Sequence, residues 1–386
     1  MESLSWLMER RLTNMKDVIG LLDCHNSPQL GELTSSRPLA STSFLGRYAF
    51  ADFALSNFCN SEISNVGILV KDHQRSILKH MGSMMSWVTN TKIGHETIFY
   101  NEKGQLNEAY NTDINNIREN DWVLYDSDAS YIVFQSSHII MDIDLRPVLE
   151  DHIARKEAIT IVYKSIDDAD KEFIGENVCE LDANGYITGW HPNDGKNTKA
   201  DVSLEVWIVN RTVLADIIRR HAEVDASFGM RDMIAWLIKK ASFKIHTYEY
   251  KGYARCFDSL PHYVEYSFEL LDRNVAATLF KPDWPIYTLT HDTPPALYGL
   301  NGNVTNSFVS NGCIVDGTVD NSILCRNVHI GKGAVVKRAI ILSNVSIGDK
   351  VQLSDVVLDK YSVVTPRHTI EGDPDNVIYL KQGAIL

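Results

Sequence analysis

The last third of the chain contains a repeat with a fixed spacing, and this repeat constrains the fold more than any other sequence feature. Ile323 and Ile340 begin two matching copies that lie 17 residues apart. The segments that match are Ile323-Leu324 with Ile340-Ile341, Asn327-Val328 with Asn344-Val345, and Ile330-Gly331 with Ile347-Gly348. A left-handed parallel β-helix has coils of three flat faces, each of about six residues with one aliphatic side chain inward. An antiparallel sandwich of valine-rich strands would not keep such a spacing.

The sequence before the repeat alternates between strand-like and helix-like segments. Strand-like runs lie at 18–22, 64–70, 131–134 and 158–163, and helical stretches lie at 145–156 and 211–221. This alternation favours an α/β fold with a doubly wound, Rossmann-like sheet. A chain of 386 residues suits two domains. We expect an N-terminal extension over 1–15, an α/β domain over 16–285, a proline-marked linker over 286–305, and the β-helix over 306–386.

Charge and cysteine usage exclude several classes of partner. The formal net charge of −13 argues against nucleic acid and against an anionic membrane surface. No apolar run reaches the length of a membrane span. The extension at 1–15 lacks the small-residue cleavage site of a secretory signal, and its role stays open. The six cysteines lie far apart without C-x-x-C spacing, which predicts reduced thiols in a cytoplasmic protein.

A series of motifs follows the first expected strand. Leu30, Leu33 and Thr34 precede Gly46-Arg47-Tyr48, and Asp52-Phe53 and Leu55-Ser56-Asn57 come next. This series resembles the ADP-glucose pyrophosphorylase (glucose-1-phosphate adenylyltransferase) family. That family has the loop G-G-x-G-x-R-L-x-x-L-T, then K-P-A, then G-G-K-Y-R-I-I-D-F-x-L-S-N. The resemblance runs from Met15 to Leu386 and implies a nucleotidyltransferase domain followed by a left-handed β-helix.

The phosphate loop of the family is altered in this chain. A triphosphate loop needs glycines, so that several backbone N–H groups can approach the phosphates, and an arginine that offsets their charge. Here Cys24, His25 and Ser27 stand at glycine positions, and Pro28 offers no N–H. Gln29 stands where the arginine belongs, and Leu39 stands at the lysine of K-P-A.

The resemblance also implies two Mg²⁺ carboxylates and two sugar-phosphate contacts. The carboxylates of the family segments S-G-D-H-I and Y-W-R-D-V-G-T align with Ser137 and Cys256. The lysine of F-x-E-K-P aligns with Asn193, and the glycine of S-M-G-I-Y aligns with Glu205. A hydroxyl and a thiol are poor ligands for Mg²⁺, which prefers anionic oxygen. We therefore expect no intact catalytic residue, no metal site and no cofactor held by intact ligands, while a catalytic partner would require Mg²⁺.

Loss of several charged groups weakens phosphoryl transfer strongly, because each such group contributes on the order of 10²-fold or more to the rate. The pattern resembles the regulatory subunits of two-subunit bacterial enzymes of this family. It implies a catalytic paralogue, joined in a heterotetramer that makes ADP-glucose from ATP and glucose 1-phosphate for glycogen synthesis. One alternative is an active nucleotidyltransferase with a rewired site, in which a neighbour such as Asp258 compensates. Another is a hexapeptide-type acyltransferase, but its catalytic histidine would need a projecting loop, and His329 falls inside a coil.

Four further residues are candidates for binding a substrate or effector. Arg37 and Arg47 lie where the family receives phosphorylated ligands, and Asp52 and Asn57 lie in the near-intact motif that follows. A sugar phosphate is the expected class of effector. We also expect the final coil of the β-helix, with its run of valines at 356–364, to present apolar surface to a partner subunit.

Overall fold

The computed structural model describes residues 15–82, 84–87, 95–125, 128–240 and 243–386. Apart from Met15, the expected N-terminal extension lies outside these residues. The chain divides into two compact units, each assembled from separate segments. The first unit comprises 1–27, 51–256 and 282–287, and the second comprises 28–50, 257–281 and 288–386. None of the helices that the structure describes is both long and apolar enough to cross a membrane.

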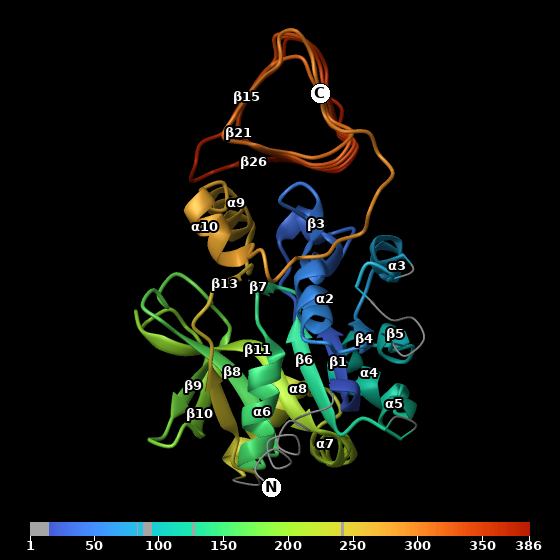
Figure 1. Cartoon of the computed structure of the whole chain (residues 1–386), viewed down its shortest axis with the longest axis vertical. Helices are drawn as coiled ribbons and strands as arrows, with labels where there is room; N and C mark the ends of the chain where they lie inside the picture. The colour runs from blue at the N-terminus through green and yellow to red at the C-terminus, as the bar shows by residue number, and fades with distance from the viewer. Residues whose placement is uncertain (1–14, 83, 88–94, 126–127, 241–242) are drawn as a thin grey trace, which may run out of the picture. The chain divides into compact units, whose positions relative to one another are not determined.

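The first unit is built on a mixed sheet, which confirms the expected α/β class (Figure 1). The main strand order is β10-β9-β11-β6-β1-β4-β5, and β8 and β12 join through β11. Strands β6, β1, β4 and β5 are parallel, whereas β11 is antiparallel to β6. The bounds are β1 Val18–Asp23, β4 Asn65–Val70, β5 His95–Tyr100, β6 Tyr131–Ser136, β8 Ile159–Ile166, β9 Asn177–Leu181, β10 Ile187–Pro192, β11 Ala200–Asn210 and β12 His246–Glu249.

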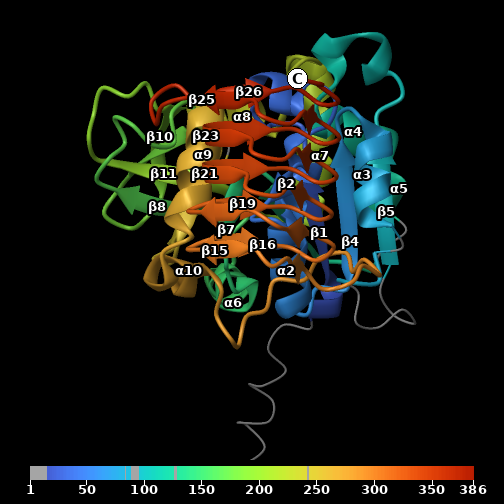
Figure 2. The same cartoon turned by 90° about the horizontal axis from the view of Figure 1, so that it is seen from above.

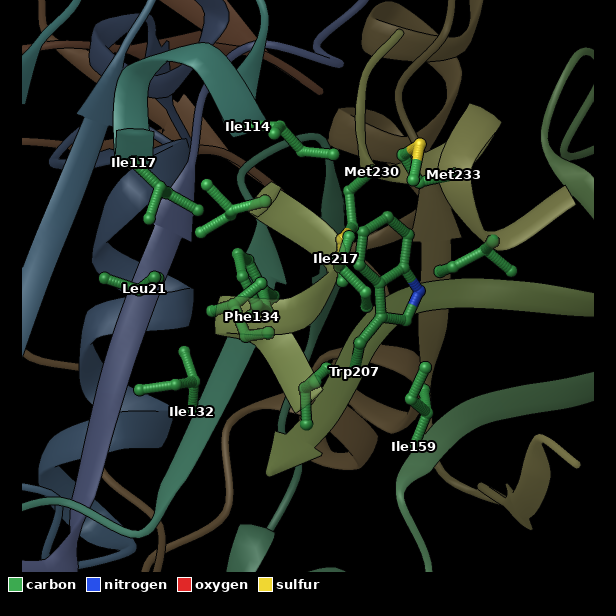
Figure 3. Close-up of a cluster of buried hydrophobic side chains, with 14 of the residues drawn as sticks. Leu21, Ile114, Ile117, Ile132, Phe134, Ile159, Trp207, Ile217, Met230 and Met233 are labelled. Carbon is green, nitrogen blue, oxygen red and sulfur yellow. The ribbon is translucent and has the colours of Figure 1, made fainter. Parts of the chain in front are cut away.

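Helices cover both faces of this sheet, as a doubly wound fold requires. On one face Leu21 and Phe134 pack with Trp207 against α4 (Asp113–Glu119), α7 (Arg211–Val224) and α8 (Met230–Lys239), as Figure 3 shows. On the other face, Gly20 of β1 lies against the ring of Phe58, and any Cβ at Gly20 would come within 2.9 Å of that ring. The remaining helices are α2 (Phe50–Asn60), α3 (Gln74–Met81), α5 (Trp122–Tyr125) and α6 (Leu145–Arg155).

The order of the strands decides where a site can form. Strands β1 and β6 are adjacent and parallel, and their last residues, Asp23 and Ser136, are paired. The loops that leave the carboxyl ends of these two strands therefore start side by side. In open α/β sheets this edge is where ligands bind.

The second unit contains the predicted β-helix. Parallel pairs stack Val319 on Val336 and Val336 on Leu353, which keeps the spacing of 17 residues found in the sequence. Figure 1 looks along the coils and shows their triangular outline, and Figure 2 shows their strands stacked in parallel. The strands are β14 Leu297–Tyr298, β15 Asn303–Thr305, β16 Phe308–Val309, β17 Ile314–Val315, β18 Thr318–Asp320, β19 Ile323–Leu324, β20 His329–Ile330, β21 Val335–Ile341, β22 Ser346–Ile347, β23 Gln352–Leu358, β24 Val363–Val364, β25 Thr369–Glu371 and β26 Ile378–Leu380.

Asparagines turn several corners of these coils. Asn327 and Asn344 occupy equivalent corners with φ of 60° and 63°, a left-handed conformation that asparagine tolerates better than most residues. The Nδ2 of Asn327 donates to Oδ1 of Asn344 at 3.2 Å. Asn306 and Asn321 are paired in the same way at 2.8 Å, so the corners form side-chain ladders as well as turns.

The final coil does not present the apolar surface expected from the sequence. Val356, Val357 and Leu358 of β23 are fully buried. The reason is that β25 and β26 both pair with β23 and cover it with the C-terminal segment. Exposed apolar side chains lie instead on the first coils, where Leu297 is 61 % exposed and Leu300 projects fully into solvent.

Two segments that precede the coils in sequence belong to the same unit as the β-helix. Phe44 and Phe50, from 28–50, pack against Phe257, with ring centroids 5.2 and 4.8 Å apart. The hydroxyl of Tyr263, on α9 (Leu260–Glu269), donates to the carbonyl of Ser43 at 2.8 Å. The unit also contains α10 (Arg273–Leu279). The compact units therefore cross the linear boundaries 16–285, 286–305 and 306–386 that the sequence suggested.

Candidate functional site

The loop after β1 is closed by its own side chains. Cys24 is buried, and Ser27 Oγ lies 2.9 Å from the hydroxyl of Ser137, which follows β6. The side chain of Asn26 donates to Asp23 Oδ2 at 2.9 Å. Burial raises the pKa of the Cys24 thiol far above its usual range, so this thiol is not a nucleophile.

His25, at a glycine position of the family loop, is an anchor and not a ligand for phosphate. Its ring is buried, Asn116 Nδ2 donates to its Nε2 at 3.0 Å, and its Nδ1 lies 3.3 Å from the carbonyl of Asn111. Burial lowers the pKa of His25 to about 4, against opposing effects that include the charge of Asp113. The ring is therefore neutral at physiological pH and carries no charge that could offset a triphosphate.

His25 should make folding stability depend on pH. Between pH 6.5 and about 4 the unfolded chain binds a proton that the folded ring refuses, so stability is lost as the pH falls through this window. We expect His25→Gln to remove a loss on the order of 2 kcal/mol between pH 7 and pH 4.5. Urea unfolding at the two pH values measures it, with the exposed His191→Gln as control. Equal pH dependence in wild type and His25→Gln would contradict this account.

Three side chains with family-assigned positions lie in the second unit. Gln29 accepts a hydrogen bond from Thr34 Oγ1 at 3.1 Å, and Leu39 is fully buried in a short 3₁₀ helix. Arg37 is buried and forms an ion pair with Asp359, to which Tyr379 also donates at 2.6 Å. These partners hold the three side chains in structural roles in this conformation.

A buried ionic cluster occupies the carboxyl-terminal edge of the sheet. Arg231 on α8 donates to Glu176 Oε2 at 2.7 Å and to Glu205 Oε2 at 2.9 Å. His138 Nε2 lies 2.9 Å from Glu176 Oε1. Burial alone would raise the pKa of Glu176, but His138 and Arg231 hold it below its usual range. The charges that face this edge are thus paired with one another.

Glu205 has replaced a glycine while keeping the backbone conformation that suits glycine. Its φ is 53°, and it lies in a bulge of β11 where the pairing with β8 shifts register. A carboxylate in this place is strained by its backbone and desolvated by its surroundings. Burial raises the pKa of Glu205 to about 8, against the opposing charge of Arg231 and with added repulsion from Glu176.

The two positions that align with Mg²⁺ carboxylates come close together, which supports the alignment. Strand β13 (Ala254–Cys256) pairs with β7 (Ile139–Met141), and Cys256 lies opposite Ile139, two residues after Ser137. The present donors do not fit Mg²⁺. The Ser137 hydroxyl is engaged with Ser27, and Cys256 offers a soft, fully buried sulfur.

Asn193 and the near-intact motif also have structural partners. Asn193 Nδ2 is directed at the carbonyls of Ala169, Glu172 and Phe173, at 2.8 to 3.2 Å. Asp52 is fully buried beside His80, with Oδ1 and Nε2 2.6 Å apart. Asn57 donates to the carbonyl of Met141 and accepts from Trp284 Nε1, both at 3.1 Å. Arg47 is exposed, and its guanidinium lies 5.5 Å from the ring of Tyr48.

Sequence reasoning missed Glu176 and Arg231. They lie 55 residues apart, and neither belongs to a motif whose spacing would mark it. Only the fold brings them to His138 and Glu205. The acyltransferase alternative gains no support, because His329 lies on β20 within the regular coils.

The fold and the altered site together define a nucleotidyltransferase-like protein with a hexapeptide β-helix. Residues 27–188 match the nucleotidyl transferase family, and residues 295–377 match the GlmU-like, C-terminal hexapeptide family. The chain is 31 % identical to the glycogen biosynthesis protein GlgD of Bacillus subtilis, over 92 % of this chain and 93 % of that protein. It is 32 % identical to GlgD of Geobacillus stearothermophilus, over 83 % of this chain and 82 % of that protein.

A glucose-1-phosphate adenylyltransferase of Fervidobacterium nodosum is also similar, with 28 % identity over 91 % of this chain and 84 % of that protein. The chain therefore belongs to the ADP-glucose pyrophosphorylase (glucose-1-phosphate adenylyltransferase) family, and it is similar to members named GlgD.

Proposed function

We propose that this chain is a regulatory, catalytically impaired subunit of glucose-1-phosphate adenylyltransferase. It supports the synthesis of ADP-glucose from ATP and glucose 1-phosphate in glycogen biosynthesis. The observation that carries the proposal is the ionic cluster of Arg231, Glu176, Glu205 and His138. It pairs the charges at the sheet edge internally, while Ser137 and Cys256 stand at the family's metal positions.

The partner in this proposal is a catalytic paralogue in a heterotetramer, which would supply the Mg²⁺ site. Exposed apolar side chains on the first coils of the β-helix support an association of this kind. Leu297, Tyr298, Leu300, Phe308 and Ile314 are each at least 37 % exposed on neighbouring strands or turns. Apolar surface of this kind favours burial against a partner. The six free cysteines are consistent with a cytoplasmic location for the assembly.

A cavity in the second unit is the favoured place for an effector within this proposal. Its volume is about 410 Å³, and it is lined among others by Ser36, Asp359 and Lys381. This volume falls within the usual range for small-molecule sites. Lys381 supplies a cation for a sugar phosphate, and exposed Arg47 remains the second candidate in the same unit.

A subunit without chemistry can raise the activity of its partner only by favouring the partner's competent conformation. We expect the mixed complex to exceed the catalytic paralogue alone in kcat or substrate affinity by about 5- to 150-fold, the range of typical coupling free energies. Steady-state kinetics on complexes of verified composition measure this gain. Arg47→Ala should reduce the gain without preventing assembly, whereas Arg75→Ala, another exposed arginine, should not. Identical kinetics with and without this chain would refute the regulatory role.

A further inference from the structure

Three donor atoms of different chemistry converge at the altered metal position. His138 Nε2, Glu176 Oε1 and Cys256 Sγ all lie within 4.8 Å of one another, and all three side chains are buried. The nitrogen and oxygen are 2.9 Å apart, and the sulfur lies 3.9 Å from the same oxygen. The residues come from three separate parts of the fold, namely the turn after β6, the segment before β9, and β13.

The donor set suits a borderline transition metal. Imidazole nitrogen, carboxylate oxygen and thiolate sulfur are the ligands that Zn²⁺ and Co²⁺ accept in tetrahedral sites, and a solvent molecule can complete the four. With bonds of about 2.0 to 2.3 Å, tetrahedral ligands lie roughly 3.3 to 3.8 Å apart. The sulfur–oxygen separation of 3.9 Å is already close to that spacing. The nitrogen and oxygen need only separate by a few tenths of an ångström.

The charges around these donors favour a cation. Asp23, Glu176 and Glu205 are buried carboxyl groups, and Arg231 and His138 are the cations that the structure places against them. Burial raises the pKa of Asp23, against weaker opposing effects of the His25 backbone, Arg231 and His138. The pKa of Glu205 is raised as well. Buried carboxyl groups with raised pKa values indicate a shortage of positive charge at this edge of the sheet.

Arg231 leaves the required oxygen of Glu176 available. Its guanidinium holds Oε2 at 2.7 Å, while Oε1 is the oxygen directed at His138 and Cys256. A ligating carboxylate is usually oriented by such an outer hydrogen bond. The cluster therefore contains both the three ligands and the group that positions one of them.

We propose that His138, Glu176 and Cys256 bind one divalent transition-metal ion of the zinc type, as a structural ion. On binding, the Cys256 thiol releases its proton to solvent, and neutral His138 coordinates through Nε2 with the proton kept on Nδ1. The ion links β13 to the turn after β6 and to the segment before β9. This proposal does not depend on the regulatory role, because it assigns the ion no part in a reaction.

Metal analysis of the full chain, purified without chelator, should give about one zinc per chain. Removal by a chelator followed by titration with Co²⁺ should produce visible bands of a tetrahedral ion and a thiolate-to-cobalt charge-transfer band. Cys256→Ser should abolish the charge-transfer band. His138→Gln should retain it but weaken Co²⁺ binding by at least about 100-fold, because the loss of a ligand exceeds the 10- to 100-fold effect of losing an outer-shell partner. Cys179→Ser, which removes another buried thiol of the first unit, is the matched control.

X-ray absorption at the zinc edge of the unaltered chain keeps the test decisive even where a variant fails to fold. One sulfur among the nearest ligands of zinc supports the site. A shell of nitrogen and oxygen alone, or a folded wild-type chain that binds no stoichiometric zinc or Co²⁺, overturns the proposal. A charge-transfer band of equal strength in folded Cys256→Ser overturns it as well.

Discussion

Purified by itself, the chain should form ADP-glucose at no more than about one ten-thousandth of the rate of a catalytic family member. The estimate rests on two groups, since the loss of one charge-stabilising group costs on the order of 10² or more in kcat. Ser137 and Cys256 stand at both family carboxylate positions, and neither suits Mg²⁺. Pyrophosphate release with ATP, glucose 1-phosphate and Mg²⁺ measures the rate, with the catalytic paralogue assayed in parallel.

A reciprocal exchange sharpens this prediction. Serine and cysteine introduced at the two matching positions of the catalytic paralogue should lower its rate by a comparable factor. In this chain, Ser137→Asp with Cys256→Asp should not restore full activity, because the His25-anchored loop and the Glu205–Arg231 pair remain. Turnover by the pure, partner-free chain near a typical enzyme value of about 10 s⁻¹ would show instead that the site has been rewired.

The β-helix could be predicted from the sequence because its order is local. Each coil repeats after 17 residues, and the inward position of each face carries an aliphatic residue, so Val336 predicts Leu353. The doubly wound sheet followed for a similar reason, since strand-like and helix-like segments alternate. Comparison with family motifs then located Ser137 and Cys256, which the pairing of β7 with β13 brings to neighbouring positions.

The contents of the site could not be predicted in the same way. Arg231 meets Glu176 across 55 residues and Glu205 across 26, and no spacing rule connects such positions. Arg37 looked like a ligand for phosphate, yet its partner in the structure, Asp359, is 322 residues away. A charged side chain has many uses, and tertiary contacts decide among them. Sequence therefore identified which groups were lost, whereas the structure was needed to find what replaced them.

Arg231→Met should lower the free energy of unfolding by about 3 kcal/mol, the lower end of the range for breaking a buried ion pair. The lower end applies because the Arg231 side chain is itself 21 % exposed, while Glu176 and Glu205 are 4 % and 2 % exposed. Without the guanidinium, both carboxyl groups stay desolvated and lack their strongest counter-charge. Urea unfolding at pH 7 measures the loss. Arg219→Met is the matched control, since that arginine is exposed and its pairing with Asp216 should contribute little.

A second substitution tests the mechanism of that loss. Arg231→Met combined with Glu205→Gly removes one stranded carboxyl group and returns residue 205 to the residue type that suits a φ of 53°. The double variant should therefore be more stable than Arg231→Met alone, although it has lost one more side chain. The pH dependence should agree: in Arg231→Met the buried carboxyl groups take up protons more readily than in the unfolded chain, so its stability should fall as the pH rises from 5 to 8. A single variant within 1 kcal/mol of wild type, or a double variant less stable than the single, would mean that the cluster is not held by Arg231.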